Sequence, residues 1–188
     1  MPYRKLAFRA GQAYHLYNRG ANRQPIFFCP ENWGFVLTLL RRFFLPELVD
    51  IIAYCLMPNH YHLQVRLKVD DLGRQVMQPF GVSYTKAVNK QQGRVGPVFQ
   101  GPFQAVQVSG DDQLVHLSRY IHLNPVSAGL VAVPEAWAFS SYRDYIGLRQ
   151  GTLPRPDEVL ALFPSRESYR DFVEGEQEES IISCIVFE

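Results

Sequence analysis

Residues 49–67 read VDIIAYCLMPNHYHLQVRL and carry the pattern that decides the fold. The first half, 49–57, is an apolar run rich in β-branched residues, which predicts a buried strand. The second half, 60–67, alternates polar and apolar residues, which predicts a strand with one face in a core. Pro58 and Asn59 between the halves are a turn signal. We therefore expect the two strands to pair as an antiparallel hairpin.

The segments around this hairpin predict two further strands and three long helices. Alternation predicts a strand over 13–17 and a short last strand over 103–108. Apolar residues at helical spacing predict helices over 30–44, 70–91 and 111–128. The order strand–helix–strand–strand–helix–strand–helix predicts an α+β fold, a small antiparallel sheet with helices packed on one face.

The C-terminal half has its own start and stop signals. Asp111 or Asp112 should cap the third long helix, and Pro125 should kink it or end it near residues 123–124. A short acidic helix is expected from Ser165, and the apolar tail 181–187 is a candidate strand.

Charge is unevenly distributed along the 188 residues, although the net charge is only +1. Residues 1–120 hold 14 Lys and Arg against 7 Asp and Glu, whereas residues 121–188 hold 5 against 11. A basic first part favours a polyanionic partner. No apolar run reaches the roughly 20 residues of a membrane helix, and the basic N-terminus lacks a signal-peptide core. We therefore expect a cytoplasmic protein without a membrane partner. The three widely spaced cysteines are expected to be free thiols.

His60 and His62 stand two residues apart on a predicted strand, so their side chains share one face. Two imidazoles at this spacing can bind one divalent ion. The alternative is two polar residues on a solvated face of the strand. Tyr61 between them should point into the core.

Tyr120 and Asn124 stand four residues apart on a predicted helix and therefore one turn apart on the same face. An amide oxygen is a ligand that suits Mg²⁺ or Mn²⁺, and a phenol can attack a polarised phosphate. The alternative is a core aromatic and a residue that caps the helix. His116, one turn before Tyr120, could contact DNA or orient the phenol, or be an ordinary surface histidine. We interpret His122 as structural and assign no role to His15.

Two basic segments with aromatic neighbours are candidates for DNA binding. Arg19 and Arg23 lie in the first, and Tyr84 and Lys86 in the second. Cationic side chains neutralise phosphates, while aromatic rings stack on unpaired bases.

Five motifs occur together and in one order. They are NRGANRQPIFF (18–28), AYCLMPNHYHL (53–63), GPVFQGPFQAVQV (96–108), RYIHLNPVSAGLV (119–131) and WAFSSYRDYIG (137–147). This set resembles the IS200-like single-tyrosine HUH transposases, and more narrowly the REP-associated tyrosine transposases. The resemblance covers roughly residues 12–147.

The resemblance implies a ferredoxin-like fold, the HUH nuclease fold, with a divalent metal ion, Mg²⁺ or Mn²⁺, as cofactor. It implies that His60, His62 and Asn124 bind the metal and that Tyr120 is the catalytic nucleophile. The implied reaction is a transesterification on single-stranded or hairpin DNA that leaves a 5′-phosphotyrosine link and a free 3′-OH.

The chain also departs from the family pattern, which has basic residues where this sequence has Pro102, Gln104 and Ser127. Each missing charge should weaken the hold on phosphates. The alternative is therefore a domesticated, non-cleaving protein that binds DNA hairpins; a replication-initiator type of nickase fits the motifs less well. We expect a transposase domain over 1–147 and a C-terminal extension over 148–188, in a monomer or a homodimer.

Overall fold

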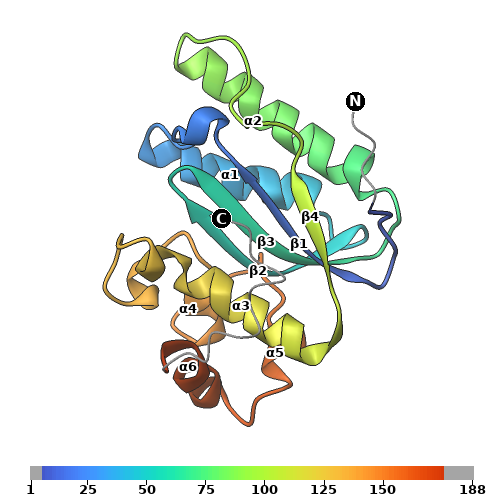
Figure 1. Cartoon of the computed structure of the whole chain (residues 1–188), viewed down its shortest axis with the longest axis vertical. Coiled ribbons are helices and arrows are strands. Elements are labelled where there is room, and N and C mark those ends of the chain that lie inside the picture. Colours follow the sequence, from blue (N-terminus) through green and yellow to red (C-terminus); the bar gives the residue numbers. More distant parts are fainter. Residues whose placement is uncertain (1–5, 176–188) are drawn as a thin grey trace.

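The computed structural model describes residues 6–175, which form one four-stranded sheet with helices on both faces (Figure 1). Neighbouring strands are antiparallel and lie in the order β2-β3-β1-β4. The strands are β1 (Ala13–Arg19), β2 (Val49–Met57), β3 (His60–Leu67) and β4 (Gln104–Val108). The helices are α1 (Pro30–Phe43), α2 (Gln78–Gln91), α3 (Gly110–Ser127), α4 (Tyr142–Tyr145), α5 (Asp157–Leu160) and α6 (Arg166–Glu174). Single turns lie at η1 (Ala21–Arg23), η2 (Gly73–Met77) and η3 (Pro134–Ala136).

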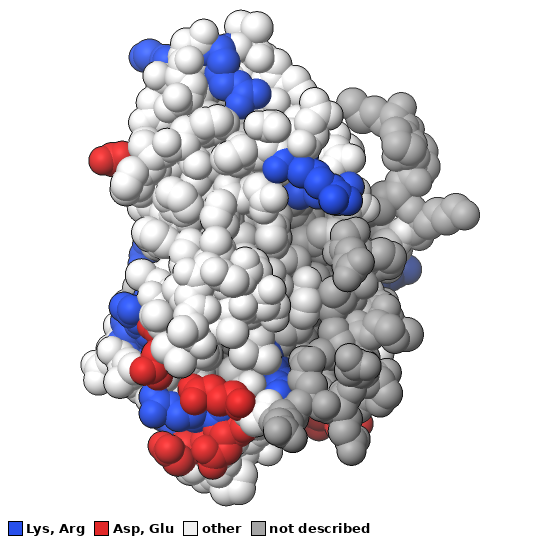
Figure 2. Space-filling model, turned by 60° about the vertical axis from the view of Figure 1, so that its left-hand side comes forward, with Lys and Arg blue, Asp and Glu red and all other residues white. Residues whose placement is uncertain are grey.

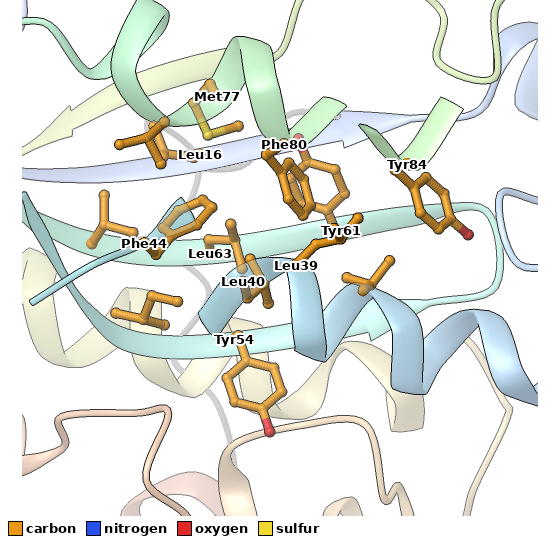
Figure 3. Close-up of a cluster of buried hydrophobic side chains, with 14 of the residues drawn as sticks. Leu16, Leu39, Leu40, Phe44, Tyr54, Tyr61, Leu63, Met77, Phe80 and Tyr84 are labelled. Atoms are coloured by element: carbon orange, nitrogen blue, oxygen red, sulfur yellow. The ribbon is translucent and has the colours of Figure 1, made fainter. Parts of the chain in front are cut away.

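Helices α1 and α2 cover one face of the sheet, because every second residue of the strands is apolar there. On β3, Tyr61 and Leu63 point to this face and are almost fully buried. They meet Leu40 of α1 and Phe80 of α2, whose ring stands edge-on to that of Tyr61 (Figure 3). This arrangement, with the connectivity β1-α1-β2-β3-α2-β4, confirms the expected ferredoxin-like α+β fold.

Helix α3 and the helices after it cover the opposite face, so the expectation of helices on one face describes only α1 and α2. The reason is a second apolar set on β2. Ile52, Cys55 and Met57 point away from α1 and are buried with Leu117 and Ile121 of α3. In Figure 1 the sheet separates α1 and α2 in the upper half from α3 to α6 in the lower half.

The N-cap of α3 and the effect of Pro125 differ from the sequence prediction, whereas the expected end of the helix before Gly129 is confirmed. Ser109 is the N-cap, and Asp111 and Asp112 lie in the first turn, where carboxylates favour the helix dipole. The helix runs through Pro125 to Ser127. Pro125 has no N–H to donate to Ile121 O, so the helix continues past it with one backbone hydrogen bond fewer.

A tight cap ends α3 two residues after Pro125. Gly129 has a left-handed φ of 67°, its N–H donates to Val126 O, and the N–H of Leu130 donates to Pro125 O. This is the Schellman pattern that commonly ends helices.

The other elements follow the sequence closely. The hairpin strands β2 and β3 have the predicted bounds, and Ser165 begins α6 by accepting a hydrogen bond from Ser168 N. Cys29 and Cys55 are free thiols. The third cysteine and the candidate strand over 181–187 lie outside the described residues. No helix in residues 6–175 is long and apolar enough to span a membrane.

The charge asymmetry is visible on the surface. On the face drawn in Figure 2, acidic side chains gather at the lower end, among basic ones and over the C-terminal helices. Ion pairs join basic to acidic side chains, as Arg66 pairs with Glu158 and Arg170 with Glu135.

Candidate functional site

A cavity of about 900 Å³ opens on the α3 face of the sheet, where β1, β3, the start of β4 and α3 meet. It brings together both predicted metal-binding histidines, the predicted nucleophile, the predicted amide ligand and both arginines of the first basic segment. Its lining is Tyr17, Asn18, Arg19, Arg23, Asn59, His60, His62, Gln100, Gly101, Pro102, Gln104, Ala105, Val106, Tyr120 and Asn124.

Strand alternation and helix spacing together bring the four central residues into contact. His60 and His62 point to the α3 face of β3, while Tyr61 points into the opposite core, as predicted. Helix α3 presents Tyr120 and Asn124, which lie one turn apart, to this face. His60 Nε2 lies 3.2 Å from Asn124 Oδ1, and the ring of Tyr120 stands edge-on to that of His62 at 5.3 Å.

His60 is held from both sides of its ring. Its Nδ1 lies 2.6 Å from Asn59 Oδ1, which leaves Nε2 facing Asn124. Burial lowers the pKa of His60, and the contact with Asn124 opposes this in part. The imidazole is therefore neutral at neutral pH, as a metal ligand must be.

His62 is more deeply buried, at 4% exposure. Its Nδ1 lies 2.9 Å from Nε2 of His15 on β1, a residue without a predicted role. Burial lowers the pKa of His62 well below its ordinary value, and the neighbouring His15 and His60 lower it further. Its other nitrogen, Nε2, is buried and has no hydrogen-bond partner among the described residues.

These contacts fit a divalent metal ion. If Asn59 Oδ1 accepts the proton of His60 Nδ1, then His60 Nε2 and Asn124 Oδ1 face each other with lone pairs, which is unfavourable unless a cation or a proton lies between them. His62 Nε2, which has no partner among the described residues, would supply a third donor atom. Residues 6–175 contain no group of three or more His, Cys, Asp or Glu placed to bind a metal, so Asn124 and outer ligands such as water or phosphate would complete the coordination.

Tyr17 of β1 is a second tyrosine in the cavity, and it begins the first basic segment with aromatic neighbours. Its ring lies 6.1 Å from that of His62. Burial raises the pKa of Tyr17, the nearby Tyr120 raises it further, and Arg19 opposes both. Tyr17 therefore remains a neutral hydroxyl beside Tyr120. Its signal was the alternation of β1, which places residues 13, 15, 17 and 19 on one face.

The first basic segment forms one wall of the cavity. Arg19 ends β1 and donates from Nε to Gln100 Oε1, while Arg23 follows in the η1 turn and is exposed. Gly20 between them permits the turn, because a Cβ there would stand 1.9 Å from the carbonyl oxygen of Gln24. The turn thus places two guanidinium groups at the rim of the site, and no lysine or acidic residue within 6–175 lines it.

The second basic segment is not part of this cavity. The prediction that Tyr84 stacks on DNA bases is wrong, because its ring is fully buried between α2 and the sheet and its hydroxyl donates to Ile26 O. Lys86 is exposed on α2, on the other side of the sheet from the cavity. His116 is half-buried on α3, with its ring 5.3 Å from that of Phe172, and does not line the cavity.

Two of the three positions that depart from the family pattern are in the cavity wall. Pro102 and Gln104 line it, and neither carries a charge. Ser127 is exposed at the end of α3 and lies outside the lining.

No known protein-family model matches the sequence. A curated protein of Haemophilus influenzae, named "Putative REP-associated tyrosine transposase", is 26% identical to this chain over 103 residues. The match covers 50% of this chain and 58% of that protein, so the chain spans little more than half the length of this relative.

Comparison with solved structures extends the likeness to the fold. The structure of a REP-associated tyrosine transposase bound to a REP hairpin has a TM-score of 0.62 and 16% sequence identity, and the superposition covers 82% of this chain and 98% of that one. The chain resembles the REP-associated tyrosine transposases. A crystal structure of a "putative transposase" from Deinococcus radiodurans has a TM-score of 0.42 and 17% identity, over 64% of this chain and 95% of that chain.

Proposed function

We propose that this protein is a metal-dependent endonuclease and strand transferase that acts on single-stranded DNA at hairpins, with Tyr120 as the nucleophile. The convergence of His60, His62, Tyr120 and Asn124 in one cavity carries the proposal. The resemblance to REP-associated tyrosine transposases supports it, and the hairpin bound in the solved relative suggests the substrate.

In the proposed reaction, the phenol oxygen of Tyr120 attacks a backbone phosphorus of the DNA. A bond forms between the phenol oxygen and phosphorus, and the bond from phosphorus to the 3′ oxygen breaks. The phenol proton ends on the departing 3′ oxygen, which gives a 3′-OH and a 5′-phosphotyrosine. Because one phosphodiester replaces another, a 3′-OH of a second strand can reverse the step and join DNA without a nucleotide cofactor.

The residues of the cavity divide this task. His60, His62 and Asn124 would hold the divalent ion, which supplies a Lewis acid that polarises the phosphate. The phenol ring of Tyr120 on α3 stands 5.3 Å from that of His62 on β3, and this fixed neighbourhood supports an attack that needs no separate ordering step. Arg19 and Arg23 neutralise phosphates of the bound strand at the rim.

A non-cleaving hairpin-binding protein is the second candidate, and the uncharged Pro102 and Gln104 in the cavity wall favour it. Loss of cationic side chains there weakens the hold on phosphates, but it leaves the nucleophile and the metal ligands in place. The same experiment decides between the two functions.

The test uses end-labelled hairpin oligonucleotides with single-stranded flanks, taken from palindromes next to the gene, and denaturing gels with Mg²⁺ or Mn²⁺. We expect the wild-type chain to form a covalent adduct, and Tyr120→Phe to form none while it still binds the hairpin in a native gel. Tyr17→Phe is the matched control, because it removes the second hydroxyl of the cavity and should leave the adduct. Hairpin binding without any adduct would establish the binding protein instead.

A further inference from the structure

We propose that His15 is a positioning residue that fixes the ring of His62 with the lone pair of Nε2 turned toward the metal. The inference rests on the proposed function, because it concerns the same metal site. Neither the spacing of the sequence motifs nor the resemblance assigns His15 a part.

The two imidazoles form a buried pair between neighbouring strands. His15 on β1 is 1% exposed and His62 on β3 is 4% exposed. His15 Nε2 and His62 Nδ1 are 2.9 Å apart, and the rings are stacked with centroids 5.0 Å apart and planes at 27°. Because both rings are buried, the direction of this hydrogen bond determines which nitrogen of His62 carries the proton.

Two proton arrangements are possible for this bond, and only one suits a metal ligand. A neutral imidazole has one N–H, so if His15 donates, the proton of His62 is on Nε2. That N–H would be buried without an acceptor among the described residues and could not bind a cation. If His62 donates from Nδ1, its Nε2 keeps a lone pair, which a divalent ion can use.

His60 shows the same arrangement with a different partner. Its Nδ1 meets Asn59 Oδ1 at 2.6 Å, and its Nε2 faces Asn124 Oδ1. The side-chain oxygen of Asn59 thus contacts Nδ1 of His60 in the same way as His15 contacts Nδ1 of His62. Both rings are anchored at Nδ1, and both residues line the same cavity.

A variant at position 15 must preserve the packing, because the ring of His15 also lies 6.2 Å from that of Tyr120. His15→Phe keeps a planar ring and removes the acceptor. His15→Gln places a carboxamide near the position of Nε2, and its oxygen can accept from His62 Nδ1. His122→Phe is the control for the loss of a buried histidine, since His122 is fully buried on α3 and does not line the cavity.

The first measurement is Mn²⁺ affinity of the full chain without DNA, by isothermal titration calorimetry. Loss of a residue that orients a metal-bound histidine typically weakens affinity by about 10–100-fold, and we expect that loss for His15→Phe. His15→Gln should regain most of the affinity. The control His122→Phe should lower the melting temperature and leave the Mn²⁺ Kd unchanged. A wild-type Kd in His15→Phe would overturn the proposal.

The second measurement needs no metal. Long-range ¹H–¹⁵N correlation spectra of metal-free protein labelled at histidine nitrogens report the tautomer of each ring. We expect His62 protonated at Nδ1 in the wild type, and a shift toward the Nε2 form in His15→Phe. Protonation of wild-type His62 at Nε2 would refute the inference. Failure of the wild type to bind Mn²⁺ would instead refute the metal site of the proposed function, while the tautomer of His62 still decides the part of His15.

Discussion

Replacing Tyr169 by Phe removes a single hydroxyl from a buried chain of hydrogen bonds that attaches α3 to the C-terminal helices. Tyr169 Oη lies 2.7 Å from His122 Nδ1 and 3.0 Å from Ser118 Oγ, and Ser118 Oγ lies 2.7 Å from Val115 O. On its other side, His122 Nε2 lies 2.8 Å from Ser141 Oγ. In the arrangement that we assign, Ser118 donates to the carbonyl, Tyr169 to Ser118, His122 to Tyr169, and Ser141 to His122, although Ser141 Oγ also lies 3.3 Å from Tyr54 O.

The variant Tyr169→Phe therefore leaves the buried Nδ1–H of His122 without an acceptor. An unsatisfied buried donor costs about 1–3 kcal/mol in the free energy of unfolding. For a domain of this size, each kcal/mol lowers the melting temperature by roughly 2–4 °C. The packing loss is small, because Phe keeps the ring of Tyr169 between its aromatic neighbours.

Urea unfolding followed by circular dichroism measures this loss, and Tyr142→Phe is the matched control. The hydroxyl of Tyr142 donates to Glu174 Oε1 at 2.6 Å, but the Glu174 side chain is 38% exposed, so water can replace the lost partner. We expect the control to lose clearly less stability than Tyr169→Phe. Equal losses in the two variants would refute the proton assignment. Well below its melting temperature, Tyr169→Phe should still form the DNA adduct, since no cavity residue changes.

Three further predictions concern the site and its acid sensitivity. His60→Ala should abolish metal-dependent adduct formation on the denaturing gel, as should EDTA with the wild type; unchanged cleavage would remove His60 from the metal site. Arg23→Ala should weaken binding of all hairpins alike and reduce the slope of log K against log salt by about one, and an unchanged slope would exclude a phosphate contact. Burial lowers the pKa of His122 from 6.5 to about 3, so below pH 6.5 the unfolded chain takes up a proton that the folded chain does not. The free energy of unfolding should thus fall by about 1.4 kcal/mol per pH unit at most between pH 6.5 and 3. Urea midpoints that stay constant over this range would contradict the prediction.

The sheet could be predicted because its signals are local. The alternation in 60–67 and the Pro58-Asn59 turn specify a hairpin without reference to any other segment. The two pairs of the site were also predictable, since i and i+2 on a strand share one face, as do i and i+4 on a helix. Only the fold shows that the two pairs face each other, with His60 Nε2 3.2 Å from Asn124 Oδ1.

The mistakes have one physical origin, because a pattern within one element does not say what that element packs against. Tyr84 and Lys86 share a basic, aromatic segment, yet α2 turns the tyrosine ring into the core on the face opposite the cavity. His15 was left without a role for the converse reason. Its partner is 47 residues away, and only the pairing of β1 with β3 brings the two together.

The apolar face of β3 also determines the chemistry of its other face. Leu63 and Val65 are fully buried under α1 and α2, and a one-residue shift of register would turn them to the α3 face and turn His60 and His62 into this apolar core. Burying two imidazoles among apolar side chains without hydrogen-bond partners is costly, so the core resists such a shift strongly. The geometry of the candidate metal site is therefore maintained by residues that never touch it. Enlarging the cavity by substitutions on the α3 face should be tolerated far better than equal changes of volume at Leu63.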